Sequence, residues 1–435
     1  MSYKALGYKK QTLDALSTGI KYYTYTVPKT DLTSALITYS RFYQGTPEET
    51  WRQIALISKG KINAEDFALY KLSFWLPSNE AINLYHKIYL NYPNGYYASE
   101  ALWNIFWHEY ASRNYQSAMT IIEKHISKYP DALAAPRVLF WAGKLLEKQH
   151  ETAQAKKYYS KIIEKFPDDY YAFRATGRLK VLNGGSDLEW GTNGRNLLPE
   201  KFKLKLPYSY DELARKEGVT AAELFMVGDY ELIALLEGFD DEYIQSWTKY
   251  REGLKSKSIV IARNTIEKAT KKPNINDIKW KYVYPLYFQQ QINKYAAQNG
   301  LDPYIVLALT REESYFNNMA VSSSNARGLM QLLPSTANDI AKWKNLGYVN
   351  DLMLFNPETN IKLGSAYISY NKEKLYGKMI FAVGAYNGGP GSIQKWLKSL
   401  EYKDIDEFIE SIPYEQTRTY IKKVYRSYWN YNKIY

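Results

Sequence analysis

The sequence contains no cysteine and only four histidines. Without cysteine the chain cannot form disulfides, thiol nucleophiles or zinc sites with cysteine ligands. The histidines all lie within the first 150 residues, so residues 151–435 contain neither His nor Cys. Ser-His-Asp and Cys-His catalytic sites are therefore excluded from that region. Chemistry there must rely on carboxylates, hydroxyls, amides, lysine or arginine.

Long apolar runs are also missing. The densest apolar stretch is Tyr304 to Leu309, far short of the roughly 18 residues that suggest a membrane-spanning helix. We therefore expect no integral membrane segment. Residues 1–7 lack the apolar core of a signal peptide. Either the protein is cytoplasmic, or its signal peptide has been removed.

The charge is unbalanced towards the basic side. Lys and Arg number 57 against 45 Asp and Glu, a net charge of +12. A basic surface suits a polyanionic partner such as a nucleic acid, an anionic membrane or an acidic wall polymer. No nucleic-acid recognition motif accompanies the charge, so a nucleic-acid partner is the least favoured of the three.

The first half of the chain contains a repeat of 37 residues, marked by Pro93, Pro130 and Pro167. Alanine stands twelve residues before each proline, and apolar residues stand eight and four before it. These offsets lie along one stripe of a helix. Alanine returns five residues after each proline, and a small or apolar residue returns eight after it. Each unit therefore predicts a helix, a turn that contains proline, and a second helix.

A single helix pair of this size cannot bury its apolar face, so successive pairs must stack. We expect more irregular helix pairs over residues 1–80, where Thr46 and Glu49 have capping-box spacing around Pro47. Asn183 to Ser186 is loop material that follows the third repeat. The predicted organisation is a helical superhelix over residues 1–204, a helical linker domain over 205–283 and a C-terminal domain over 284–435.

Chemistry concentrates where the C-terminal domain begins. Asp302 is a suitable N-cap and Pro303 a suitable first residue for a helix that is apolar nearly all round. Glu312 and Glu313 follow, about 100° apart around this helix. A carboxyl on either stripe would lose water and have its pKa raised, as a general acid requires near neutral pH. Periodicity does not decide which of the two faces a cleft.

Ser314 follows Glu313 directly. Three further motifs follow this Glu-Ser pair in order: Gly328-Leu329-Met330-Gln331, then Ala385-Tyr386-Asn387-Gly388-Gly389-Pro390-Gly391, then Ile412 to Tyr420. In these motifs and in the gaps between them, residues 284–435 resemble the family 1 soluble lytic transglycosylases. The resemblance extends more weakly to the N-terminal helical array. It implies an all-α fold, in which a superhelix of stacked helix pairs precedes a lysozyme-like, goose-type helical catalytic domain.

The resemblance implies that Glu313 is the catalytic residue, because Ser314 follows it, and that Glu312 is non-catalytic. It also implies a set of substrate-binding residues. These are Ser314, Ser322, Gln331, Leu333, Tyr386, Asn387, Glu415 and Gln416. Tyr386 matches the tyrosine whose hydroxyl approaches the catalytic carboxyl. Gln416 departs from the family pattern, since it occupies the position of an expected glutamate while Glu415 stands one residue early.

The activity that the resemblance implies is non-hydrolytic cleavage of the β-1,4 bond between N-acetylmuramic acid and N-acetylglucosamine in peptidoglycan, which leaves 1,6-anhydro-N-acetylmuramoyl ends. It needs no metal and no cofactor. The partner would be peptidoglycan glycan strands and the location the periplasm, with the signal peptide removed. Two alternatives stay open: a hydrolase with goose-type lysozyme activity, and an inactive wall-binding scaffold.

Overall fold

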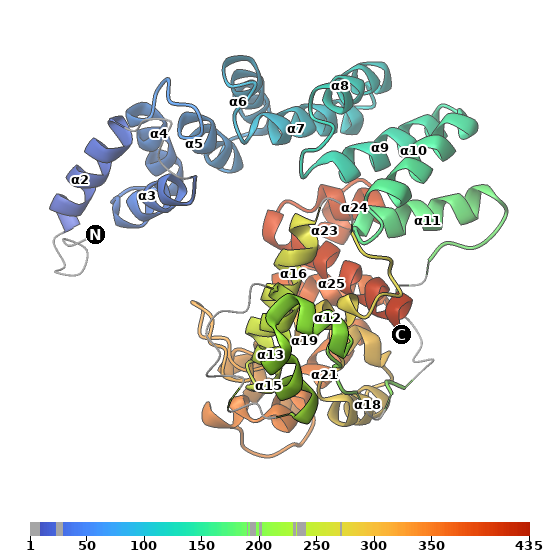
Figure 1. The fold of residues 1–435 in the computed structure, drawn as a ribbon. Helices are drawn as coiled ribbons and strands as arrows, with labels where there is room; N and C mark the ends of the chain where they lie inside the picture. Colours follow the sequence, from blue (N-terminus) through green and yellow to red (C-terminus); the bar gives the residue numbers. More distant parts are fainter. Residues whose placement is uncertain are drawn as a thin grey trace. The chain divides into compact units, whose positions relative to one another are not determined.

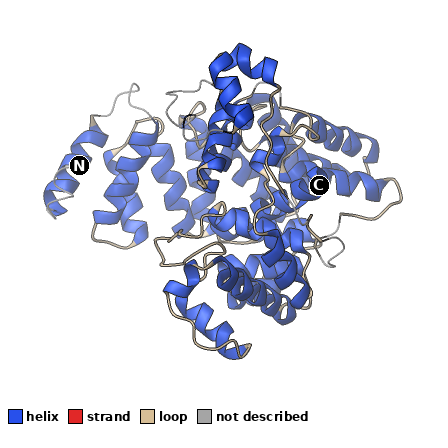
Figure 2. Ribbon diagram, turned by 60° about the horizontal axis from the view of Figure 1, so that its bottom comes forward, coloured by secondary structure: helices blue, strands red, loops and turns tan. Residues whose placement is uncertain are grey.

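The computed structural model describes residues 9–22, 29–188, 190–191, 197–199, 202–228, 232, 241–269 and 272–435. The expectation about residues 1–7 therefore lies outside the described residues. Within the described ranges the chain is all-helical and contains no β-strand, only two isolated bridges at Arg327 (Figure 2). The predicted all-α fold class is confirmed. None of the described helices is long and apolar enough to cross a membrane.

The chain forms two compact units, Met1–Asp187 and Leu188–Tyr435. The predicted division of the second part into residues 205–283 and 284–435 is finer than these units and stays a prediction. The first unit contains consecutive helices that pack against their neighbours along the chain (Figure 1). They are α2 (Lys9–Lys21), α3 (Lys29–Phe42), α4 (Pro47–Ile57), α5 (Glu65–Leu72), η1 (Ser73–Trp75), α6 (Ser78–Asn91), α7 (Ala98–Ala111), α8 (Tyr115–Lys128), α9 (Ala135–Lys148), α10 (Thr152–Lys165) and α11 (Tyr170–Leu182).

The repeat prolines separate the helices of each pair, as the sequence predicts. Pro93, Pro130 and Pro167 each stand two residues beyond a helix, after α6, α8 and α10. The aromatic residue before each proline is the C-cap, and its backbone is nearly the same each time, with φ between −129° and −131° and ψ between 52° and 54°. Such an extended φ fits the restriction that proline places on the preceding residue. The repeat is therefore one of backbone geometry as well as of sequence.

Most of the predicted apolar stripe is buried. The alanines twelve before and five after each proline are buried, as are the residues eight before and eight after it. The position four before is buried only at Tyr89, while Ile126 and Ile163 are half-buried. The position five before is buried in every repeat, at Ile88, His125 and Ile162. The prediction of a stripe through the position four before the proline was thus partly wrong. On a helix the position five before lies about 20° from the position twelve before, whereas the position four before lies about 80° from it.

The capping box at α4 is confirmed. The backbone N–H of Thr46 donates to Glu49 Oε2 at 2.7 Å, and the N–H of Glu49 donates to Thr46 Oγ1 at 3.2 Å. Pro47 occupies the first helical position, where no partner for its missing N–H is needed. This start of α4 is fixed by local interactions alone.

The second unit contains a helical segment followed by the C-terminal helices. The first group is α12 (Tyr210–Glu217), α13 (Val219–Val227), α15 (Glu242–Arg251), α16 (Lys255–Lys268) and α17 (Lys279–Val283). The second group is α18 (Gln289–Gln298), α19 (Pro303–Ser314), α20 (Pro334–Trp343), η2 (Leu352–Phe355), α21 (Pro357–Lys374), α22 (Met379–Gly388), α23 (Pro390–Ser399), α24 (Ile405–Ser411) and α25 (Glu415–Ile434). Helix α25 packs against both α19 and α22.

Candidate active site

The C-terminal end of helix α19 presents the two adjacent glutamates. The helix begins as predicted, with Asp302 accepting a hydrogen bond from the N–H of Tyr304 at 2.9 Å and with Pro303 as the first residue. Every residue from Pro303 to Arg311 is buried. The helix therefore runs through the interior of the unit over this length. Glu312 and Glu313 lie at its C-terminal end and are half-buried.

Glu313 lies against a tyrosine of helix α25. The hydroxyl of Tyr420 donates to Glu313 Oε1 at 2.5 Å. The pKa of Glu313 is raised to about 7: burial is the main cause, the hydrogen bond from Tyr420 lowers the pKa in part, and the negative charge of Glu312 raises it. The loss of water is the dominant cause because it penalises the ionised form. At neutral pH this carboxyl can both give and take a proton, which is the property of a residue that alternates between acid and base.

Glu312 is held very differently. Its carboxylate forms an ion pair with Arg311 and accepts a hydrogen bond from Ser427 Oγ at 2.5 Å. The side chains of Glu312 and Arg311 are 8% and 4% exposed. Arg311 also donates from Nε to the carbonyl of Val283 at 3.0 Å. Glu312 is thus committed to a buried ion pair, in keeping with the expectation that it is non-catalytic.

The segment after α19 is fastened to two helices. Ser314 Oγ donates to the carbonyl of Leu329 at 2.7 Å, and the Tyr386 hydroxyl of α22 donates to the carbonyl of Met330 at 2.8 Å. Ser314 is buried, so its hydroxyl serves the loop. The Tyr386 hydroxyl bonds to Met330 and not to Glu313, although the charge of Glu313 raises its pKa further after burial. Two predicted site residues therefore meet at one loop.

Asn360 of helix α21 holds the same loop from a third side. Its Oδ1 accepts from the N–H of Met330 at 2.7 Å, and its Nδ2 donates to the carbonyls of Arg327 at 2.9 Å and Leu354 at 2.8 Å. Asn360 is fully buried. Gly328 has φ +77° and lies so close that an added Cβ would be 2.1 Å from the carbonyl oxygen of Leu354. The glycine of this motif is therefore required by both backbone and space.

Gln331 and Ser322 use their polar groups within this loop. Gln331 has φ +47°, and its Nε2 donates to the carbonyls of Ala320 at 3.1 Å and Gly328 at 2.9 Å. This left-handed backbone conformation is unfavourable for residues other than glycine, so the surrounding contacts must stabilise it. Ser322 Oγ accepts from the N–H of Ala326 at 3.0 Å. Both residues are half-buried and shape the loop from within.

The other predicted residues lie at helix starts and ends. Leu333 precedes α20 and is 40% exposed, and Glu415 and Gln416 are exposed in the first turn of α25. Asn387 Oδ1, near the end of α22, accepts from Thr417 Oγ1 at 3.0 Å. This bond ties α22 to the first turn of α25. The structure thus links Ser314, Gln331 and Tyr386 through one loop and Asn387 to α25, while Leu333, Glu415 and Gln416 stand at the surface.

Tyr420 is the contact that the sequence did not single out. It is the last residue of the segment Ile412 to Tyr420, in which the sequence departs from the family pattern at Gln416. Its spacing on α25 could have indicated that it is buried, because Thr417, Tyr420, Ile421 and Val424 lie on one face of the helix. All four are buried. A periodic buried stripe that includes a tyrosine predicts a hydroxyl near the interior, but not which group it meets.

Comparison with known proteins defines the class of this domain. Residues 290–409 match the family model described as the transglycosylase SLT domain, and residues 137–169 match that of a tetratricopeptide repeat. The second unit therefore carries a transglycosylase SLT domain, and the resemblance to the soluble lytic transglycosylases is confirmed.

Two relatives specify the resemblance further. The chain is 36% identical over 152 residues to the soluble lytic murein transglycosylase of Escherichia coli (strain K12), which is 34% of this chain and 24% of that protein. It is 38% identical over 149 residues to the putative soluble lytic murein transglycosylase of Haemophilus influenzae, which is 33% of this chain and 25% of that protein. The match spans about a quarter of the length of these relatives.

A solved structure extends the likeness of fold to nearly the whole chain. The lytic transglycosylase Slt of Pseudomonas aeruginosa, solved as an inactive glutamate-to-glutamine mutant, has a TM-score of 0.59 and 19% identity. The match covers 98% of this chain and 73% of that one. The predicted fold, a superhelix of helix pairs followed by a lysozyme-like domain, is thereby confirmed.

Proposed function

We propose that this protein is a lytic transglycosylase of peptidoglycan, and that Glu313 is its catalytic residue. The observation that carries this proposal is the half-buried Glu313 carboxyl, whose pKa is raised to about 7, at the end of α19 in an SLT domain. The relatives that match this domain are lytic murein transglycosylases, and the solved Pseudomonas relative is described as inactive when one glutamate is replaced by glutamine.

The proposed chemistry needs only one carboxyl from the protein. Protonated Glu313 donates its proton to the oxygen between N-acetylmuramic acid and N-acetylglucosamine, the bond from C1 to that oxygen breaks, and the electron pair leaves with the N-acetylglucosamine. The 2-acetamido oxygen of the muramoyl sugar stabilises the cation at C1 as an oxazolinium. Glu313, now ionised, takes the proton of the O6 hydroxyl, and O6 bonds to C1 to give the 1,6-anhydro ring. One residue acts first as acid and then as base, which suits a pKa near 7.

The neighbouring carboxyl does not compete for this role. Most glycosidases use a second carboxylate as nucleophile or base. Glu312 is paired with Arg311 and Ser427, so it is occupied by buried partners. This supports a mechanism in which the substrate itself supplies the group that a second carboxylate would otherwise provide.

The proposed substrate contacts divide into two groups. Leu333, Glu415 and Gln416 are exposed, and we propose that they contact the glycan strand at the surface. Ser322, Gln331, Tyr386 and Asn387 are half-buried and carry hydrogen bonds within the protein, so we propose that they contact sugar through their remaining surface. Ser314 acts by holding the loop, since its hydroxyl is buried and bonded to Leu329.

The proposed partner is a peptidoglycan glycan strand, and the proposed location is the periplasm, where this polymer lies. The basic net charge of +12 suits the carboxylates of the lactyl groups and stem peptides. We keep the division into a superhelix over residues 1–204, a linker domain over 205–283 and a catalytic domain over 284–435 as part of this proposal.

Product identification tests the proposal. Purified sacculi are digested with the wild-type protein and with Glu313→Gln, and the released muropeptides are analysed by mass spectrometry. We expect 1,6-anhydro ends from the wild type and none from Glu313→Gln. Reducing ends would instead establish a hydrolase, and full activity of Glu313→Gln would refute the assignment of the residue. No products from the folded wild type would favour a wall-binding scaffold.

A further inference from the structure

The first unit contains a hollow between helices α8, α9 and α10, here called the α8–α10 hollow. The space between its lining residues is about 290 Å³ when open solvent is included, and the enclosed part is much smaller. Its lining includes His125 and Ile126 of α8, Tyr129 directly after α8, residues of α9, and the exposed Lys161 and Lys165 of α10. This place lies in the helical repeats, far along the chain from Glu313, and the proposed chemistry gives it no task.

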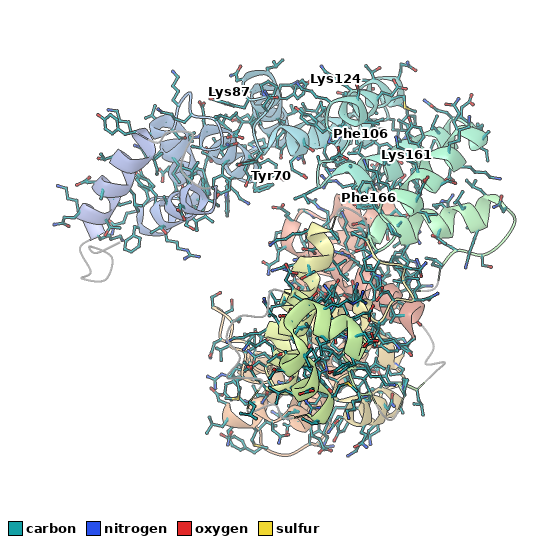
Figure 3. All side chains as sticks on the ribbon, in the orientation of Figure 1. Tyr70, Lys87, Phe106, Lys124, Lys161 and Phe166 are labelled. Carbon is teal, nitrogen blue, oxygen red and sulfur yellow. The ribbon has the colours of Figure 1, made fainter. Side chains whose placement is uncertain are left out.

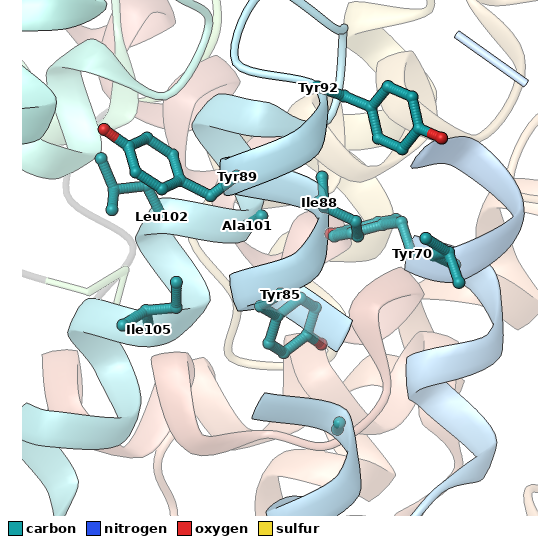
Figure 4. Close-up of a cluster of buried hydrophobic side chains, with 10 residues drawn as sticks. Tyr70, Tyr85, Ile88, Tyr89, Tyr92, Ala101, Leu102 and Ile105 are labelled. Atoms are coloured by element: carbon teal, nitrogen blue, oxygen red, sulfur yellow. The ribbon is translucent and has the colours of Figure 1, made fainter. Parts of the chain in front are cut away.

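Comparison with the preceding repeat shows that the hollow lacks one aromatic ring. Each of its lining residues has a counterpart 37 positions earlier, in α6, the turn after it, α7 and α8. Most of these counterparts form a filled hydrophobic cluster that includes Ile88, Tyr89 and Leu102 (Figure 4). Ile126 stands where the earlier repeat has Tyr89, so a phenol ring is replaced by a smaller aliphatic side chain. The hollow lies where the sequence removes that ring.

Lysines cover the ring in the filled copy. Lys124 Nζ and Lys128 Nζ lie 4.7 Å and 4.8 Å from the centroid of the Tyr89 ring, within the range of cation–π attraction. Lys161 and Lys165 are their counterparts 37 residues later. Lys87, Lys124 and Lys161 recur on α6, α8 and α10 as one position of the repeat (Figure 3). The α8–α10 hollow therefore has the same two lysines as the preceding repeat, but an isoleucine in place of the tyrosine.

The polar groups of the hollow differ in whether they have partners within the protein. Lys165 Nζ is held by Asp131 Oδ1 at 2.6 Å, whereas Lys161 has no ion pair or hydrogen bond within the described residues. His125 is 1% exposed, its Nε2 lies 2.9 Å from Ser99 Oγ, and its buried Nδ1 has no hydrogen-bond partner in the described part of the chain. The hollow thus offers a mostly apolar lining and an unpaired cation, while His125 lies buried beneath its surface.

We propose that the α8–α10 hollow binds an aromatic side chain of an acidic partner peptide, with the ring in the position that Tyr89 occupies in the preceding repeat. Lys161 and Lys165 cover the face of the ring, and Lys161 pairs with a carboxylate beside it. The choice of an aromatic occupant follows from the filled copy of the site within the same chain. The choice of an acidic peptide follows from the unpaired Lys161 at the rim.

Calorimetric titration of the full chain with two probe peptides tests this proposal. The probes are acetyl-Glu-Tyr-Glu-amide and acetyl-Glu-Ala-Glu-amide. We expect the tyrosine peptide to bind with one site per chain and the alanine peptide to bind at least roughly tenfold more weakly, since the ring supplies burial and cation–π contact. Equal binding of the two peptides, or no binding of either, would overturn the proposal.

Two substitutions locate the binding. Ile126→Tyr restores the ring of the preceding repeat and should abolish binding, and Lys161→Gln should weaken it. Lys180→Gln on α11, an exposed lysine outside the hollow, is the matched control and should leave binding unchanged. Binding that survives Ile126→Tyr in a folded protein contradicts the assigned site, as does an equal loss in Lys180→Gln.

The repeat supplies a reciprocal test. Tyr89→Ile opens the earlier copy of the site beneath Lys124 and Lys128, so the number of peptide sites per chain should rise from one to two. A third arm titrates a purified disaccharide tetrapeptide from the wall. If that ligand binds in the hollow and the tyrosine peptide does not, the hollow is a substrate contact and the proposed partner is wrong. None of these measurements depends on catalysis, so they stand apart from the test of Glu313.

Discussion

Glu312 and Glu313 are adjacent in the sequence but lie in opposite environments. Glu312 is ion-paired with Arg311, while Glu313 accepts a hydrogen bond from a neutral hydroxyl, that of Tyr420 at 2.5 Å. A helix turns by about 100° per residue, so neighbouring side chains reach different surroundings. The ion pair keeps a negative charge beside Glu313, and this charge adds to the effect of burial on its pKa.

Replacing Glu313 should abolish activity and change how stability depends on pH. Loss of an acid–base group of this kind costs at least about 10²-fold in rate. Because the pKa of Glu313 is raised from 4.5 to about 7, the folded protein binds more protons than the unfolded chain between these values. The free energy of unfolding of the wild type therefore falls as pH rises through this window, by roughly 3 kcal/mol at most.

The check is denaturant unfolding of the wild type and Glu313→Gln at pH 4.5 and pH 8. Glu313→Gln carries no titrating group at this position, so it should be more stable relative to the wild type at pH 8 than at pH 4.5. An unchanged difference between the two pH values would show that Glu313 does not have a raised pKa.

Tyr420→Phe should raise the pKa of Glu313 further. The Tyr420 hydroxyl donates to the carboxylate and thereby favours its ionised form, so the pKa is lower than it would be without this bond. The alkaline limb of the pH–rate profile, where the acid loses its proton, should move to higher pH. Tyr425→Phe is a suitable control, because that hydroxyl donates to the carbonyl of Trp190 instead. A shift in both variants would argue for a general loosening of α25.

Glu312→Gln should move the profile in the opposite direction. Removing the charge of Glu312 takes away one cause of the raised pKa of Glu313, so the alkaline limb should move to lower pH. The variant also leaves Arg311 buried without its counter-charge, which should reduce the free energy of unfolding by about 3–5 kcal/mol if glutamine restores none of the contacts. Ser427→Ala removes a hydrogen bond to Glu312 but no charge, so it should lower stability with little shift of the profile.

Gly328→Ala should displace the loop that bonds to Ser314 and Asn360. Its φ of +77° disfavours alanine, and the new Cβ would collide with the carbonyl of Leu354. We expect a loss of more than about 1 kcal/mol in the free energy of unfolding. Gly347→Ala is the matched control, since Gly347 has φ +83° and nothing within 4 Å of the added Cβ. A similar loss in the two variants would show that backbone conformation alone, and not crowding, requires Gly328.

Patterns that depend on local chemistry were predictable from the sequence. The caps at Thr46 and Asp302 and the prolines between paired helices all follow from contacts within a few residues. The prediction of the repeat's buried stripe was less accurate. Tertiary packing buries His125 and Ile162, whereas the predicted positions one residue later, Ile126 and Ile163, are half-buried. An apolar residue on either side of the stripe satisfies the same sequence pattern.

The site was predictable where it rests on a motif and not where it rests on contacts between helices. Glu313 follows from the Glu-Ser pair, but the sequence offers no measure of how α25 is rotated against α19. The contact of Tyr420 is therefore absent from the predicted set. Tyr386 is expected near the carboxyl; the charge of Glu313 acts on its hydroxyl, which donates its hydrogen bond to the carbonyl of Met330. Both outcomes depend on the packing of helices that lie far apart in the chain.

The loop around Met330 is anchored by side chains from three helices: Ser314 on α19, Asn360 on α21 and Tyr386 on α22. For protein engineering this means that the loop cannot be transferred alone. Residues 315–333 grafted into another helical scaffold would not keep their conformation unless the three anchoring side chains were transferred as well. Swapping specificity between related domains would therefore require exchanging the anchors and the loop together.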